Sequence, residues 1–188
     1  MRVLVACEES QVVTIAFRAR GQEAYSCDIQ PCSGGHPEWH LQCDVLTVLD
    51  RGWDLMIAHP ECTRLCNSGV RWLTERDLWE DMRKAADFFN KLKNAEQIPK
   101  RCVENPIPHR YAREIIGGYT QIIQPNQFGH PESKATCLWL FNLPVLIPTN
   151  IVGVAEQRIW KMPPSPERAK LRSKTFPGIA KAMAEQWG

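Results

Sequence analysis

A cysteine and a glutamate stand just past the ends of two apolar runs in this sequence. The run WDLMIAHP ends at Pro60, and Glu61 and Cys62 follow it directly. The run KRCVE ends at Glu104, and Asn105-Pro106 stop it. A thiolate can add to an electron-poor carbon, and a neighbouring carboxylic acid can give a proton to the ring under attack. These residue types indicate nucleophilic catalysis, while burial as an inert small side chain is the alternative for Cys62.

Further acids accompany the other apolar runs. Glu8 follows the run RVLVAC, Asp28 stands near the end of EAYSCDI, and Asp44 lies in a short third element at 43–49. Ligands of open parallel sheets bind outside the carboxyl ends of the strands. Asp28 suits the ribose hydroxyls of a nucleotide, and Asp44 could accept a hydrogen bond from an exocyclic amine, which together predict an adenosine-shaped pocket. Each acid alone is also a common turn former or helix cap.

The elements that must position these residues alternate between strand and helix. We expect strands at 2–7, 23–29, 43–49, 53–60, 100–104, 120–125 and 135–144, and helices at 11–21, 76–95, 111–118 and 175–187. Prolines cluster between residues 144 and 174, which predicts an irregular connection before the closing helix. This order predicts an α/β fold with a largely parallel sheet, in a single domain over residues 1–188.

Composition narrows the class of protein. The chain has 188 residues, 44% hydrophobic and 23% charged, with a formal net charge of +2, which permits a nucleic-acid partner without requiring one. It has neither an apolar run of membrane-spanning length nor the pattern of a signal peptide, so we expect a cytoplasmic protein. Its eight cysteines then indicate metal binding, catalysis or burial rather than a disulfide framework.

A zinc site is a weak alternative within CDIQPCSGGHPEWHLQC. Soft ligands are present there, but no tight Cys-x-x-Cys pair. The candidates are Cys27, Cys32, His36, His40 and Cys43. The competing interpretation is an exposed loop whose Gly34-Gly35 turn brings Trp39 over the edge of a cofactor.

Several segments, in order, resemble the catalytic domain of the cytosine C5 DNA methyltransferases, in a short form similar to proteins of bacteriophages and prophages. IAHPECT resembles the segment of that family that ends in its nucleophilic cysteine, and VENPIPH resembles its Glu-Asn-Val segment. The cofactor-binding segments of the family are resembled by VLVACEESQVVTIAFRARG, SCDI and QCDVL. Its late segment is resembled by FGHPESKATCLWL, and its closing helix by FPGIAKAMAEQW.

This resemblance implies a Rossmann-like methyltransferase fold, a three-layer α/β/α arrangement whose mostly parallel sheet has an antiparallel final strand. It implies transfer of a methyl group from S-adenosylmethionine to C5 of cytosine in DNA, with Cys62 as nucleophile, Glu104 as proton donor to N3 and Asn105 in support. The implied cofactor-binding residues are Cys7, Glu8, Asp28, Ile29, Asp44, Val45, His59 and Pro60. The expected substrate-binding residues are Arg64, Ser68, Arg71, Lys134 and Thr136, of which the cationic ones are candidates for phosphate contacts.

Three departures from the family leave other functions open. The family's glycine-rich turn is replaced by Glu8-Glu9-Ser10-Gln11, and a proline of the family is replaced by Glu61. The third departure is that no large insertion for reading duplex sequence precedes the closing helix. The DNA substrate could therefore be single-stranded or weakly sequence-specific, and a mononucleotide is also open. One alternative is a nucleotide or modified-base enzyme of a phage pathway that does not use S-adenosylmethionine. The other is a catalytically degenerate protein that binds nucleic acid or a host partner.

Overall fold

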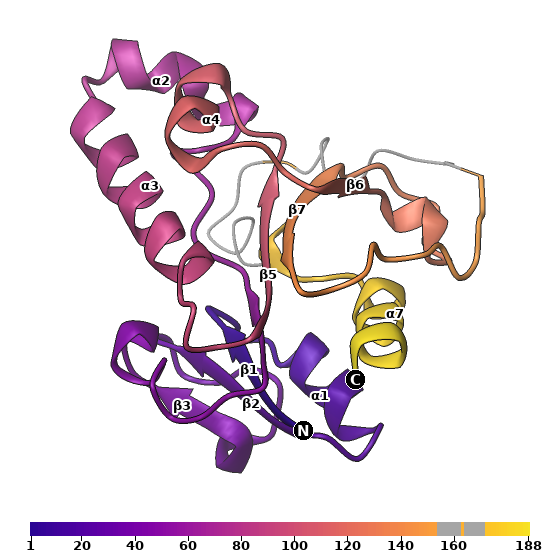
Figure 1. Ribbon diagram of the computed structural model, residues 1–188. Coiled ribbons are helices and arrows are strands. Elements are labelled where there is room, and N and C mark those ends of the chain that lie inside the picture. The colour runs from indigo at the N-terminus through magenta and orange to yellow at the C-terminus, as the bar shows by residue number, and fades with distance from the viewer. Residues whose placement is uncertain (154–162, 164–171) are drawn as a thin grey trace.

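The computed structural model describes residues 1–153, 163 and 172–188. Much of the predicted proline-rich connection, residues 154–162 and 164–171, lies outside the described residues. Within the described part, the chain forms one sheet with helices on both faces (Figure 1).

The sheet has the strand order β3-β2-β1-β4-β5-β7-β6. Its strands are β1 (Arg2–Ala6), β2 (Glu23–Asp28), β3 (His40–Gln42), β4 (Leu55–Ala58), β5 (Lys100–Pro106), β6 (Gln121–Ile123) and β7 (Thr136–Phe141). The first five strands run parallel, and β7 is antiparallel to both β5 and β6. The order reverses between β1 and β4, and such a switch point is where open α/β sheets bind ligands.

The central strands are apolar because both of their faces are covered. Val3 and Val5 of β1 contact one hydrophobic cluster, whereas Leu4 and Ala6 contact the other. All four side chains are fully buried. Successive residues of a strand point to opposite faces, so a strand between two helical layers must be apolar at every position. Burial of a valine or leucine side chain stabilises the fold by about 1.5–3 kcal/mol.

The helical layers lie on opposite faces of the sheet. On one face are α3 (Trp79–Lys93) and α4 (Arg110–Ile116), together with the short α2 (Val70–Glu75), which precedes α3. On the other face, α1 (Val12–Arg18) packs beside α7 (Pro177–Trp187) (Figure 1). In α3, Met82, Ala86, Phe89 and Leu92 form the buried stripe that the helical spacing predicts.

Two local features differ from the sequence-based expectations. The third strand is His40–Gln42, and Asp44 follows it instead of lying within a strand at 43–49. The reason is that Asp44 accepts a hydrogen bond from Leu46 N (2.9 Å) and so begins a 3₁₀ turn over Val45–Thr47. The helix α2 was not predicted, since only Leu73 of its six residues is buried and its apolar periodicity is weak.

The closing helix is confirmed at Pro177–Trp187, two residues shorter than the predicted 175–187. Its buried side chains include Ile179, Met183 and Trp187, as the sequence pattern indicates. Trp187 Nε1 donates to Pro144 O (3.1 Å), which ties the end of the chain to the exit of β7. None of the helices in the described residues combines the length and the apolar character needed to cross a bilayer.

Candidate functional site

The residues that the sequence singles out lie at the carboxyl edge of the sheet. His59 follows β4, where its backbone N donates to Ala6 O of β1 (2.9 Å). Glu8 follows β1, and its backbone N donates to Cys27 O of β2 (3.2 Å). Glu104 lies in β5, in register with Leu138 of the antiparallel β7. These side chains share an edge because the strands that carry them are parallel neighbours.

The loop after β4 holds Cys62 at the head of a tight turn. Cys62 O accepts from Leu65 N (2.9 Å) and from Cys66 N (3.0 Å). The loop is tied to the segment that follows Glu104 and Asn105, because Asn67 N donates to Ile107 O (3.0 Å) and a β-bridge joins Cys66 to Pro108. Pro60, at the start of the loop, is buried.

His109 strengthens this connection between the two segments. The side chain is 2% exposed, its Nδ1 accepts from Ala112 N at the start of α4 (3.0 Å), and its Nε2 donates to Arg64 O (2.9 Å). These contacts define the neutral imidazole with its proton on Nε2. His109 therefore caps α4 and at the same time holds the loop that carries Cys62.

Cys62 and Cys66 form a thiol pair in which Cys66 is the stronger acid. A hydrogen bond from Cys62, aided by Ser68 and the backbone N–H groups of Ser68 and Gly69, holds the pKa of Cys66 below its ordinary value against the opposing effect of burial. The pKa of Cys62 lies above its ordinary value because of that hydrogen bond, burial and the negative charges of Cys66, Glu104 and Glu61. Ser68 Oγ lies 3.1 Å from Cys66 Sγ. The surroundings thus favour the first thiolate on Cys66.

Glu104 lies among cationic partners. Its Oε1 is 3.6 Å from His59 Nδ1, and the two side chains are 18% and 9% exposed. Burial would raise the pKa of Glu104, but His59 and Lys134 outweigh it and bring that pKa below its ordinary value. Neither ring nitrogen of His59 has a hydrogen-bond partner, although both are buried.

A small cavity of about 20 Å³ lies beside this pair. Polar groups from His59, Glu104, Lys134 and Thr136 line one side, and apolar side chains of α7 line the other. Lys134 Nζ also donates to Arg172 O (2.7 Å), and Thr136 Oγ1 donates to Lys134 O (3.2 Å). The cavity therefore combines a carboxylate, an ammonium and an imidazole with an apolar wall.

Asn105 is fully buried beside Glu104. Its Nδ2 donates to Pro106 O (2.5 Å), and its Oδ1 has no hydrogen-bond partner. It thus holds the strand at the point where β5 leaves the sheet.

A second group of predicted residues lies at the ends of β1, β2 and β3. Burial and the charges of Asp28 and Asp44 raise the pKa of the Cys7 thiol to about 12, so the three groups are close neighbours. Asp28 Oδ1 accepts from Gln30 N (2.8 Å). Ile29 is 70% exposed, whereas Val45 is buried. Two carboxylates and an exposed apolar side chain thus stand at the ends of these neighbouring strands.

Glu8 faces inward instead. Its carboxylate accepts from Val13 N (2.6 Å), Thr14 N (3.2 Å) and Thr14 Oγ1 (2.7 Å), and the residue is 5% exposed. Burial raises its pKa, against the charge of His59 and these hydrogen bonds. Glu8 therefore satisfies the first turn of α1, a place where helix N–H groups otherwise bind external anions.

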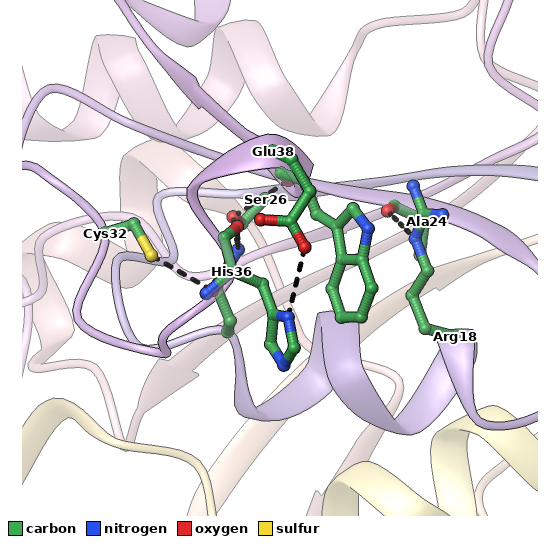
Figure 2. A network of polar contacts seen from close by, with 8 residues as sticks. Arg18, Ala24, Ser26, Cys32, His36 and Glu38 are labelled. Carbon is green, nitrogen blue, oxygen red and sulfur yellow. Dashed lines mark hydrogen bonds and ion pairs between the residues drawn. The ribbon is translucent and has the colours of Figure 1, made fainter.

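Most of the zinc candidates have partners of their own, and Figure 2 shows the contacts of His36 and Cys32. His36 stacks on Trp39 at 3.8 Å between ring centroids and lies 3.2 Å from Glu38 Oε1. Cys32 Sγ donates to Gln11 Oε1 (3.0 Å), and Cys27 Sγ lies 3.8 Å from Cys43 Sγ. His40 bridges Ser26 Oγ (2.8 Å) and Gln30 O (2.9 Å). No group of three or more ligands that could hold a metal ion occurs in the described residues.

The predicted substrate-binding residues fall around the rim of the site. Ser68 belongs to the Cys66 surroundings, and Lys134 and Thr136 line the cavity. Arg64 lies 3.9 Å from Asp81, and the guanidinium of the exposed Arg71 lies 4.1 Å from the centre of the Trp72 ring.

Sequence analysis did not assign roles to Cys66, His109 or Gln11. The four-residue spacing from Cys62 was the only signal for Cys66. The buried Gln11 donates to His36 O (2.8 Å) and accepts from His36 N (3.0 Å), so it anchors the loop between β2 and β3. Such tertiary contacts leave no local pattern in a sequence.

Comparison with known proteins supports the fold. No protein-family profile matches the chain, and no curated protein matches it. Among solved structures, a prophage-encoded E. coli protein described as a DNA modification methyltransferase has a TM-score of 0.53 at 12% identity, over 81% of this chain and 52% of that one. A triple mutant of Spodoptera frugiperda DNMT2 has a TM-score of 0.42 at 12% identity, over 83% of this chain and 57% of its own.

The chain thus spans about half the length of the prophage protein. At this level of identity the likeness concerns the fold alone. Together with the mostly parallel sheet and its antiparallel β7, it confirms the Rossmann-like methyltransferase fold.

Proposed function

We propose that the protein transfers a methyl group from S-adenosylmethionine to C5 of cytosine in DNA. The observation that carries this proposal is the arrangement around Glu104. Cys62 is close enough for the charge of Glu104 to act on its thiol, and both residues stand at the edge that carries Asp28 and Asp44. A nucleophile, a proton donor and a nucleoside-like subsite are the parts that this reaction requires.

Cys62 performs the covalent step. Its sulfur adds to C6 of the base, and its proton passes to the thiolate of Cys66, with which it is hydrogen-bonded. Glu104 donates a proton to N3, so the added electron pair is held in the ring and C5 becomes nucleophilic. Bound S-adenosylmethionine supplies the electrophilic methyl group. The C5 proton then passes to solvent, Cys62 leaves C6 and recovers its proton from Cys66, and N3 returns its proton to Glu104, which restores the aromatic ring.

The nucleoside part of the methyl donor would be held by Asp28, Ile29, Asp44, Val45 and Cys7. The acids accept from hydroxyl and amine groups, and Ile29 supplies apolar cover. The substrate that these surroundings suit best is single-stranded DNA, because a duplex base must first be flipped out at a cost of a few kcal/mol.

Trapping of the covalent intermediate tests the proposal. A single-stranded oligonucleotide with 5-fluorocytosine, mixed with the protein and S-adenosylmethionine, should give an adduct that survives denaturing electrophoresis, because fluorine blocks the elimination. Cys62→Ser should abolish the adduct. Cys32→Ser is the matched control, since serine can also donate to Gln11, and it should keep the adduct. Adduct formation by Cys62→Ser would refute the assignment.

A second candidate is a nucleotide or modified-base enzyme that does not use S-adenosylmethionine. The observation that favours it is Glu8, whose carboxylate takes the helix N–H groups of α1 and adds negative charge next to the site. Calorimetric titration with S-adenosylhomocysteine separates the two candidates. Binding near 1 μM, about −8 kcal/mol, supports methyl transfer, and the absence of binding supports the second candidate.

A further inference from the structure

His59 is the buried polar side chain at this edge whose contacts the proposed reaction leaves unexplained. Its imidazole is 9% exposed, and neither ring nitrogen has a hydrogen-bond partner. Nδ1 has the long 3.6 Å contact with Glu104 Oε1 and Nε2 has no hydrogen-bond partner, and a buried imidazole so weakly paired is expected to serve a purpose. It lines the cavity beside Glu104 and Lys134.

The charged groups around His59 come from three segments. Glu104 of β5 has its Oε1 3.6 Å from His59 Nδ1. Glu8, after β1, lies close enough for the charge of His59 to act on its carboxyl. Lys134, before β7, lines the same cavity, whereas Ile179 and Met183 of α7 and Phe176, which precedes that helix, carry no charge. His59 thus lies near two carboxylates and one ammonium.

This arrangement conflicts with the role of Glu104 as a proton donor. His59 and Lys134 favour its carboxylate form and keep its pKa below the ordinary value, despite burial. A carboxylate cannot donate a proton to N3 of a base. A second group must therefore supply the proton when the base arrives, and histidine is the side chain that most readily does so near neutral pH.

We propose that His59 holds the proton that Glu104 donates: His59 Nδ1–H first passes its proton to Glu104 Oε1, and Glu104, now a carboxylic acid, gives that proton to N3 of the base. The step is balanced, because the imidazolium becomes a neutral imidazole and the carboxylate is unchanged after one proton has passed through it. The proton returns to the pair when the base is released. His59 is thus a positioning residue that acts through Glu104. The inference rests on the proposed function.

The His59–Glu104 pair should keep its proton up to a higher pH in the wild type than in a variant that lacks the imidazole. In the wild type the imidazole and the carboxyl share one proton. In His59→Gln that proton can reside only on the Glu104 carboxyl, and a carboxylic acid is a stronger acid than an imidazolium, so the loss comes at lower pH. We expect the high-pH limb of the adduct rate to move down by roughly one pH unit, which gives an adduct about tenfold slower at fixed neutral pH.

Two measurements on His59→Gln test this inference. The first is the rate of adduct formation with the 5-fluorocytosine oligonucleotide as a function of pH. The second is the ¹³C titration of the Glu104 carboxyl in the free protein, where loss of the imidazole should raise the pKa of Glu104. His36→Gln, whose ring stacks on Trp39, is the control and should change neither.

The outcomes separate the two proposals. If the carboxyl titration and the pH limb both move, the proton-holding role is supported. If the adduct forms and neither moves, His59 has no such role, while methyl transfer stands. If the wild type forms no adduct but the carboxyl titration still moves, methyl transfer falls, while the His59–Glu104 proton pair stands.

Discussion

At the scale of single residues, the thiolate-stabilising groups surround Cys66 more closely than Cys62. Ser68 Oγ and two backbone N–H groups lie near the Cys66 sulfur, whereas Glu104 and Glu61 place negative charge near Cys62. If the proposed chemistry holds, the thiolate of Cys66 serves as the base for the thiol of Cys62. The reactivity of Cys62 then depends on a neighbour that donates nothing to the substrate.

This arrangement predicts which thiol ionises first. On an ultraviolet titration of the folded protein, a thiolate band should be present at neutral pH and should disappear as the pH falls through the pKa of Cys66. Cys66→Ser should remove the band, and Ser68→Ala should move its midpoint to higher pH, because one donor to the thiolate is lost. A band that persists in Cys66→Ser would assign the acidic thiol to another cysteine. Burial raises the pKa of Cys7, Cys27, Cys102 and Cys137, so none of these is expected to replace it.

Sequence analysis located the edge of the sheet but not the partners of the residues on it. Apolar runs ending in Asp28, His59 and Glu104 revealed strand ends, because parallel strands buried on both faces are apolar throughout. The inward turn of Glu8 and the pairing of Cys62 with Cys66 depend on the path of a loop, and no periodicity encodes that path. Among the zinc candidates, Cys27 and Cys43 have their sulfur atoms 3.8 Å apart, but no third candidate joins them, for the same reason.

At the scale of elements, the loop after β4 and the N-terminus of α4 act as one unit. His109 joins them through Arg64 O and Ala112 N, and the bridge between Cys66 and Pro108 adds a second connection. The nucleophile and the acid come from different strands, and so their relative position depends on this joint. Small errors of position are costly in catalysis.

Two substitutions at His109 separate its roles. Asparagine caps a helix but is too short to reach Arg64 O as well, so His109→Asn should keep α4 while loosening the loop. We expect its free energy of unfolding to fall by less than that of His109→Ala, which leaves buried groups unpaired at a cost of about 1–3 kcal/mol. Urea unfolding measures this difference. Both variants should form the 5-fluorocytosine adduct more slowly than wild type, and an unchanged rate in His109→Asn would show that the contact with Arg64 O is unimportant.

At the scale of the whole molecule, positive charge exceeds negative charge only slightly. The formal net charge is +2, and the cations near the site are Arg64, Arg71 and Lys134. A net charge of +2 gives only a weak overall attraction for DNA. If single-stranded DNA is the substrate, its phosphates must meet these few side chains, and its affinity must depend only moderately on salt.

The salt dependence of binding is therefore a quantitative test of the substrate. Three phosphate contacts to a single strand predict a slope of log K against log salt of about −2, and removal of one contact reduces its magnitude by about 0.7. Arg71→Ala and Lys134→Ala should each show that reduction in fluorescence anisotropy with a labelled oligonucleotide. Lys181→Ala, on the outer surface of α7 beside Glu185, is the matched control and should leave the slope unchanged. A slope near zero in the wild type, or an equal effect of Lys181→Ala, would exclude a strand bound across this edge and favour a mononucleotide, whose single phosphate requires fewer contacts.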